Sequence, residues 1–212
     1  MAITATITGG TPREPIPAGN YVARCYQMLH IGTVEETYEG VSKMANKARI
    51  AWELPTELKV FSEEKGEQPF VISKEYTLSM HEKSTMRKDL ASWRGKDFTE
   101  EQAKGFDITR LIGVPCMINI IHKKSLDGTR TYERIAGITP LPRGFECPPA
   151  ILPIVKYEHE APDDLFVETL PDFIKDKIKS SLEWKARYTS HVVENQAPQH
   201  EDGLELTYDL PF

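Results

Sequence analysis

"KARIAWEL" at residues 47–54 is the stretch that decides the fold. Its apolar and polar residues alternate, and a period of two is typical of a strand with one buried face. Pro55, which follows at once, is expected to end this strand. The alternation assigns Ala48, Ile50, Trp52 and Leu54 to the core and leaves Lys47, Arg49 and Glu53 on the opposite face.

The sequence on both sides predicts further strands and one helix. β-branched and aromatic residues are frequent in four more stretches, at 21–31, 70–80, 114–123 and 130–138. After the third strand the period changes, and Ser84 is a favourable N-cap for a helix. Three apolar residues at helical spacing follow it, which predicts a helix over 84–95: Met86, Leu90 and Trp93. The capping-box sequence that begins at Thr99 predicts a second helical piece.

The predicted order is therefore strand, strand, strand, helix, strand, strand. A mainly β fold with this order, a five-stranded barrel with a helix between the third and fourth strands, is the oligonucleotide/oligosaccharide-binding (OB) fold. Segments 33–46 and 55–69 are expected to be connections, the second one mobile or hairpin-like. The chain divides into a flexible arm (1–19), the OB domain (20–143), a Pro-rich extension with a helix (144–190) and an acidic tail (191–212).

The extension is expected to hold one amphipathic helix over 170–187. Its apolar side would consist of Phe173, Ile174, Ile178 and Leu182. Such a helix suits packing against the body of the protein or contact with a second copy. A homo-oligomer is therefore one possible state.

Basic and aromatic residues interleave on several predicted strands, where alternate residues share a face. Cations on such a surface follow the backbone of single-stranded nucleic acid, and the rings stack on bases without demanding a sequence. The same residues also suit an ordinary exposed strand face, and Trp52 and Trp93 are assigned mainly to the core. The candidate nucleic-acid-binding residues are Arg24, Tyr26, Tyr38, Lys43, Lys47, Arg49, Lys74, Tyr76, Trp93, Arg94, Lys123, Lys124, Arg130, Tyr132 and Arg134.

The formal net charge of −6 is unevenly distributed along the chain. Residues 1–143 carry 20 Lys and Arg against 18 Asp and Glu, whereas residues 144–212 carry 6 against 14. A nearly neutral body is thus followed by an acidic tail, so the total charge does not argue against a nucleic-acid partner.

The sequence contains no familiar catalytic, phosphate-binding or metal-ligand motif, so neither catalysis nor a cofactor is expected. A metal-dependent nuclease could still use carboxylates that lie in no motif, such as Glu53, Glu75 and Asp107. The three cysteines form no CxxC pair and are expected to be reduced. With no signal peptide and no apolar run of membrane-spanning length, a cytoplasmic protein is expected.

The sequence closes with "EDGLELTYDLPF" at residues 201–212, an acidic stretch with an apolar tip. This tail resembles that of bacterial and phage single-stranded DNA-binding proteins, which end in an acidic run followed by Pro-Phe. The resemblance implies that the tip docks into basic-rimmed apolar pockets of replication and recombination proteins. The residues that carry this partner-binding role would be Asp209, Leu210, Pro211 and Phe212. Alternatively, "LELTYDL" within the tail could pair as a strand.

The body is also similar to a group of phage-encoded single-stranded DNA-binding proteins over about residues 20–143. The stretches that carry this similarity are "TLSM" (77–80), "WRGKDFTEEQ" (93–102) and "GVPCMINIIHK" (113–123). It implies binding and protection of exposed strands during phage DNA replication and recombination, in the host cytoplasm and without catalysis. Two other classes stay open, a protein-interaction or virion-structural β-barrel module and a metal-dependent nuclease.

Overall fold

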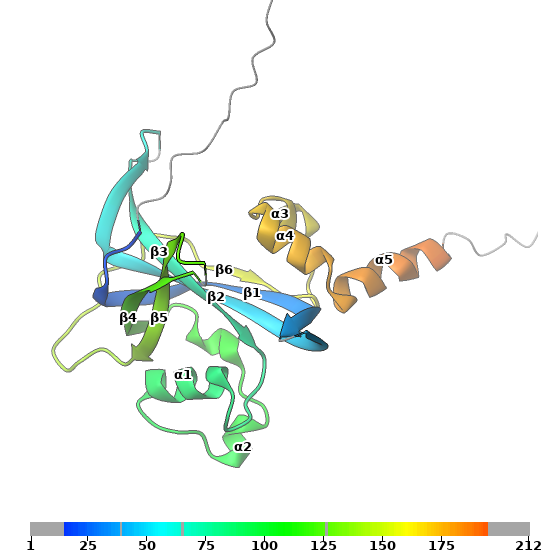
Figure 1. Ribbon diagram of the computed structural model, residues 1–212, viewed down its shortest axis with the longest axis horizontal. Coiled ribbons are helices and arrows are strands. Elements are labelled where there is room, and N and C mark those ends of the chain that lie inside the picture. The colour runs from blue at the N-terminus through cyan, green and yellow to red at the C-terminus, as the bar shows by residue number, and fades with distance from the viewer. Residues whose placement is uncertain (1–14, 39, 65, 126, 195–212) are drawn as a thin grey trace, which may run out of the picture.

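The computed structural model describes residues 15–38, 40–64, 66–125 and 127–194. Five strands form one curled antiparallel sheet, a half-barrel in the order β3-β2-β1-β4-β5. Figure 1 shows α1 and α2 at one end of this half-barrel, whereas α3, α4 and α5 lie on the other side of the sheet. The strands are β1 (Gly19–Tyr38), β2 (Val41–Ser62), β3 (Gly66–Thr77), β4 (Pro115–Lys124), β5 (Thr131–Thr139) and the short β6 (Val155–Tyr157). The helices are α1 (Thr85–Arg94), α2 (Glu100–Ala103), the 3-10 turn η1 (Ile108–Leu111), α3 (Asp164–Glu168), α4 (Asp172–Lys179) and α5 (Leu182–Glu194).

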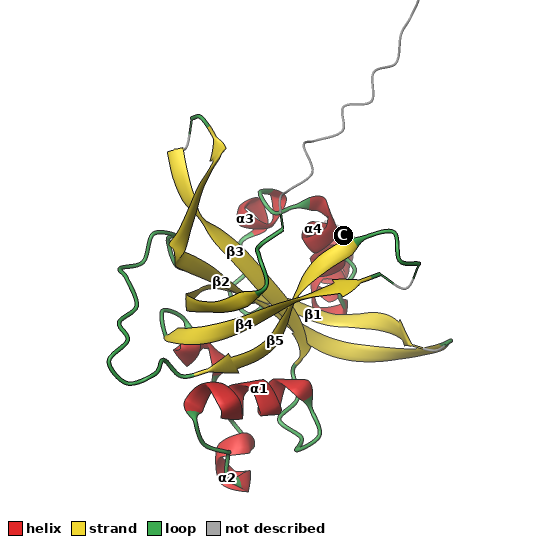
Figure 2. Ribbon diagram, turned by 60° about the vertical axis from the view of Figure 1, so that its left-hand side comes forward, coloured by secondary structure: helices red, strands yellow, loops and turns green. Residues whose placement is uncertain are grey.

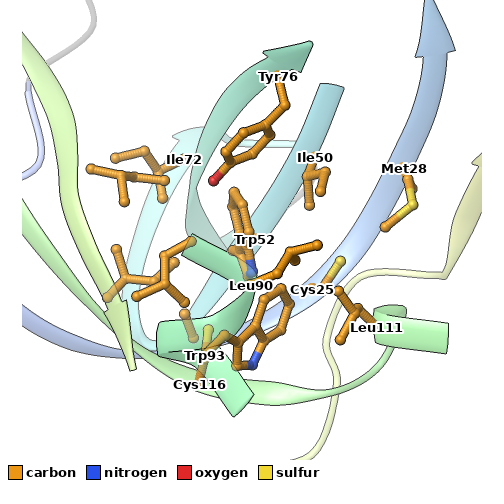
Figure 3. Close-up of a cluster of buried hydrophobic side chains, with 14 of the residues drawn as sticks. Cys25, Met28, Ile50, Trp52, Ile72, Tyr76, Leu90, Trp93, Leu111 and Cys116 are labelled. Atoms are coloured by element: carbon orange, nitrogen blue, oxygen red, sulfur yellow. The ribbon is translucent and has the colours of Figure 1, made fainter. Parts of the chain in front are cut away.

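The alternation in β2 places its apolar residues in the core, as the sequence predicts. Ile50, Trp52 and Leu54 are all at most 1% exposed, and Trp52 lies beside Trp93 of α1 with ring centroids 5.8 Å apart. Figure 3 shows Trp52, Tyr76 and Leu90 pointing into this first apolar cluster, which fills the half-barrel. The assignment of Trp52 and Trp93 to the core is confirmed.

The predicted helix over 84–95 is confirmed as α1, and its ends explain its length. The side chain of Ser84 accepts a hydrogen bond from the Arg87 backbone, and Gly95 ends the helix in a left-handed conformation. The capping box at Thr99 is also present and begins α2.

The two expected connections are largely strand, which corrects the sequence prediction. β1 and β2 continue as a hairpin through residues 33–46, where Val34 is buried and faces Ala45 across the ladder. Pro55 does not end β2, because it lies at a register shift between Leu54 and Leu58, where no ladder hydrogen bond is needed. Figure 2 shows the β2–β3 hairpin projecting away from the rest of the sheet.

A second apolar cluster lies between the far half of β1 and the C-terminal helices. It contains Leu29, Ile31, Val34, Tyr157, Val167, Leu170, Ile174, Ile178 and Trp184. β1 reaches it through a bulge between Cys25 and Gln27, beyond which β6 pairs parallel to β1 at Gln27–Leu29. The bulge shifts the alternation of β1 by one residue, so that beyond it Met28 still faces the first cluster while Leu29 and Ile31 face the second.

The single helix expected over 170–187 is wrong, because the chain breaks at Ser180–Ser181 into α4 and α5. The hydroxyl of buried Ser181 accepts a hydrogen bond from the Trp184 backbone and so begins a new helix. The break also changes the apolar side, since Ile174 and Ile178 are buried whereas Phe173 and Leu182 are 64% and 52% exposed.

α5 is fixed to β1 at Gly32, which has a φ of +91°. The backbone amide and hydroxyl of Thr33 donate to the Glu183 carboxylate at 2.6 and 2.7 Å. A Cβ at Gly32 would lie 2.6 Å from Glu183 Oε2 and 2.7 Å from His159 Nε2, so only glycine allows this approach. In the part of the chain that the structure describes, no helix is long and apolar enough to cross a membrane.

Candidate nucleic-acid interface

A basic groove of about 630 Å³ lies where β2, β3 and β5 meet the start of α1. Four of the predicted cations, Lys43, Lys47, Lys74 and Arg134, line it together with Lys83 and His81. These residues come from segments up to 91 positions apart in the sequence, and the curl of the sheet brings them to one surface. Lys83 was not predicted, because it stands alone in a loop with no strand pattern around it.

The lysines of this groove differ in how far their charge is already neutralised. Lys47 is buried and forms an ion pair with Glu36 at 2.6 Å, and Lys74 pairs with Asp89 at 2.5 Å. Within residues 15–38, 40–64, 66–125 and 127–194, no carboxylate lies within 4 Å of the other three cations, Lys43, Lys83 and Arg134. Those three therefore offer most of the positive charge that an anionic partner would meet.

Tyr76 faces the inside of the half-barrel, so its ring is not open to a base. It is 4% exposed, and its hydroxyl donates to Asp89 Oδ2 at 2.8 Å. Burial and the Asp89 charge both raise the pKa of this tyrosine. Tyr76 does share a face with Lys74, as predicted, but that face leads to α1 and the core.

Trp93 is likewise 4% exposed, with its indole N–H donating to the Pro115 carbonyl at 3.1 Å. The sequence suggested either core packing or nucleic-acid binding for Trp93, and the structure favours core packing. Arg94 next to it is half-buried over the Phe98 ring, 4.1 Å from the centroid, and lines neither groove of the β2–β3 surface.

A second groove of about 380 Å³ lies on the outer face of β1, β2 and β3, with the start of α4 as one wall. Tyr26 and Arg49 line it, as does Phe173 of α4. One guanidinium nitrogen of Arg49 donates to Ser73 Oγ at 2.6 Å, and the guanidinium lies over the Phe173 ring, 5.3 Å from its centroid. Burial lowers the pKa of Arg49 and raises that of Tyr26.

The two grooves adjoin along β2 and β3. Arg49 pairs with Glu75, which lines the basic groove, and Ala51 pairs with Ser73, which lines the outer one. Phe173 has no counterpart among the predicted site residues, because it was assigned to an apolar packing face. The spacing does carry a signal: Ile174 and Ile178 are one turn apart, so Phe173 points about 100° away from them.

Other predicted residues lie away from both grooves. Arg24 donates to the carbonyls of Gly113 and Pro148 at 2.9 and 2.7 Å. The bulge between Cys25 and Gln27 interrupts the alternation that had placed Arg24 and Tyr26 on one face. The β4–β5 hairpin exposes Lys123, Lys124, Arg130 and Tyr132, and none of these four lines a groove. Tyr38 ends β1 opposite Val41, and nothing is described of its side chain.

The three carboxylates considered for a nuclease have separate structural roles. Glu53 is fully buried and accepts from the backbone amides of Ile151 and Leu152, although its alternation had placed it on an exposed face. Glu75 pairs with Lys177 at 2.5 Å, and Asp107 begins η1. Among the described residues, no three His, Cys, Asp or Glu side chains are grouped as metal ligands would be.

Comparison with protein-family models, with curated proteins and with solved structures gives no match. The grooves must therefore be interpreted from their own chemistry. The predicted partner-binding residues Asp209, Leu210, Pro211 and Phe212 lie outside the described residues, as does most of the predicted arm at 1–19.

Proposed function

We propose that this chain binds single-stranded DNA with little sequence preference, along the two adjoining grooves on β2 and β3. The observation that carries the proposal is the combination of unpaired cations with an exposed aromatic ring on one continuous surface. Lys43, Lys83 and Arg134 would neutralise phosphates, while Phe173 and Tyr26 would contact bases. A groove of this kind suits a single strand, whose bases are free to stack on side chains.

The strand order supports an OB-type architecture for this surface. An order of β3-β2-β1-β4-β5, with α1 between β3 and β4 in the chain and packed against β5, is the arrangement from which such barrels are built. In OB folds the strands near β2 and β3 and the loops β1–β2 and β4–β5 bind oligonucleotides. The exposed Lys123 and Lys124 would extend the surface at one end.

The acidic tail extends the proposal to protein partners. Residues 209–212 would recruit replication or recombination proteins in the host cytoplasm of a phage, without catalysis by this chain. Removal of residues 195–212 should leave DNA affinity equal or higher and abolish that recruitment. Loss of DNA binding on this deletion would contradict the role given to the tail.

A protein-interaction module is the second candidate, because the β2–β3 hairpin exposes Leu58, Val60 and Phe61 at 44–52%. A titration of a labelled dT oligonucleotide, with a duplex control, separates this candidate from DNA binding. Single-strand binding that weakens steeply with salt supports our proposal, and no binding at any salt supports the interaction module. Cleavage that requires magnesium would instead indicate a nuclease.

A variant with fewer positive charges tests where the bound DNA strand lies. Replacing Lys43, Lys83 and Arg134 together with Gln should lower the salt dependence, log Kd against log salt, by about 2, since each phosphate contact contributes about 0.7 for single strands. Replacing Lys96, Lys104 and Lys185 together with Gln is the matched control, because these three exposed lysines line neither groove and should not change the slope. An unchanged slope in the triple variant would place the strand elsewhere.

A further inference from the structure

The aromatic ring of Phe173 lies where a helix of the C-terminal extension meets the outer face of the sheet. Phe173 is 64% exposed, whereas its neighbour Ile174 is 6% exposed and packs into the second apolar cluster. A single exposed apolar side chain needs no explanation by itself. The position of this ring does need an explanation, because the ring forms one wall of a groove and lies beneath the guanidinium of Arg49.

Both partners of this contact are held in place by bonds to the sheet. Arg49 is fixed by its hydrogen bond to Ser73 Oγ. α4 is fixed by Lys177, which pairs with Glu75 of β3 at 2.5 Å and lies 3.9 Å from Glu36 of β1. The ring and the cation are therefore presented in a fixed geometry before any ligand arrives, which lowers the entropy lost on binding.

Polar groups that can adapt to different ligands line the same groove. Tyr26 and Gln27 are both half-buried there, and within the described residues neither side chain makes a hydrogen bond. A hydroxyl and an amide can each donate or accept. The groove volume of about 380 Å³ lies within the range of small-molecule sites.

We propose that Phe173, Arg49 and Tyr26 form a subsite for one unpaired nucleobase, which stacks on the exposed face of the Phe173 ring. Arg49 polarises and orients this ring from its other side, and the Tyr26 hydroxyl and Gln27 amide contact the edge of the base. The inference rests on the proposed binding of single-stranded DNA and makes the C-terminal extension part of the interface. A phosphate backbone held in the basic groove would run past this subsite, since Lys47 and Arg49 are only about 7 Å apart along β2.

The test compares two ligands on the full chain: a labelled dT oligonucleotide and an abasic oligonucleotide of equal length. Phe173→Ala should weaken dT binding about 5- to 150-fold, the usual effect of removing one stacking ring. Binding of the abasic strand should change less than about twofold, because no cation is removed. Phe173→Tyr should retain dT affinity, since it keeps the ring.

Leu165→Ala is the matched control, because Leu165 is 83% exposed on α3 of the same helical layer and lines neither groove. Equal losses in Phe173→Ala and Leu165→Ala, or equal losses on both ligands, would overturn the subsite. Unchanged dT affinity in Phe173→Ala would overturn it while leaving the proposed function intact. Failure of the wild-type chain to bind dT would overturn both.

Discussion

The two apolar clusters of this protein are built in different ways, although β1 contributes to both. The first cluster fills the half-barrel and combines alternating residues of the strands with the apolar side of α1. The second joins one face of the far half of β1 to three short helices and the three-residue strand β6. Ion pairs and a carboxylate–backbone contact at Thr33 fasten this second layer to the sheet.

The half-barrel and the layer of C-terminal helices therefore contribute differently to the two grooves. The half-barrel holds β2 and β3 in register and so places Lys47, Lys74 and Arg49. The helical layer carries no cation of the basic groove but supplies Phe173 to the outer one. Damage to the half-barrel should therefore remove the whole interface, whereas damage to the helical layer should remove only part of it.

The largest effect is expected from Trp52→Ala, which removes the largest fully buried side chain of the first cluster. Loss of burial and the resulting cavity should lower the free energy of unfolding by about 3–5 kcal/mol. Denaturant unfolding followed by circular dichroism measures this change. A loss below about 1 kcal/mol would contradict the role of Trp52 as the centre of the half-barrel.

A smaller and more local effect is expected from Gly32→Ala. The new methyl group would meet Glu183 and His159, and alanine at φ +91° is strained, so the cost should be about 2 kcal/mol. Hydrogen exchange should show α4 and α5 less protected while β2, β3 and β4 keep their protection. Gly40→Ala is the matched control, with φ +79° and nothing within 4 Å of the new atom. Equal effects in both variants would mean that backbone strain alone, not helix docking, is responsible.

The smallest effect is a pH dependence confined to the helical layer. Burial lowers the pKa of His159 below its usual 6.5, although its bond to the Ile31 carbonyl opposes the shift. The unfolded chain therefore binds more protons just below pH 6.5, and stability should fall as the pH falls through that region. Burial opposes ionisation of Glu183, but the bonds from Thr33, a bond from its own backbone and the charge of His159 together lower its pKa, which adds a loss in the same direction under more acidic conditions.

Thermal unfolding at pH 7.5 and 5.5 measures this dependence, with an expected decrease in Tm of no more than about 3 °C. His159→Gln can keep a hydrogen bond to the Ile31 carbonyl but cannot titrate, so its Tm should change less between the two pH values. The same decrease in both proteins would assign the effect to other groups.

Local signals in the sequence predict much of the half-barrel. Alternation in residues 47–54 identifies the buried face of β2, and the Ser84 and Thr99 caps locate α1 and the start of α2. These patterns depend on neighbours a few positions away, which a sequence displays directly. The mainly β order of elements follows from them.

The remainder depends on contacts between distant segments. A period of two shows that Lys74 and Tyr76 share a face, but not that this face is covered by Asp89 and α1. Pro55 suggested a strand end, and the strand predicted over 21–31 stops just before Gly32. Both residues instead lie within β2 and β1 at irregularities of the ladder, which sequence spacing does not distinguish from an end. Phe173 gains its place beside Arg49 only because α4 docks on a strand more than a hundred residues earlier.

Cross-linking of an oligonucleotide to the full chain tests most directly whether the two adjoining grooves on β2 and β3 are the binding surface. The three tryptophans are buried, so intrinsic fluorescence is a poor reporter and peptide mapping after ultraviolet irradiation is preferable. We predict cross-links from a dT oligonucleotide within residues 43–49 of β2, 71–77 of β3 and 171–174 at the start of α4, weakened by salt. Cross-links confined to α1 and α2, or equal cross-linking of duplex DNA, would contradict this account.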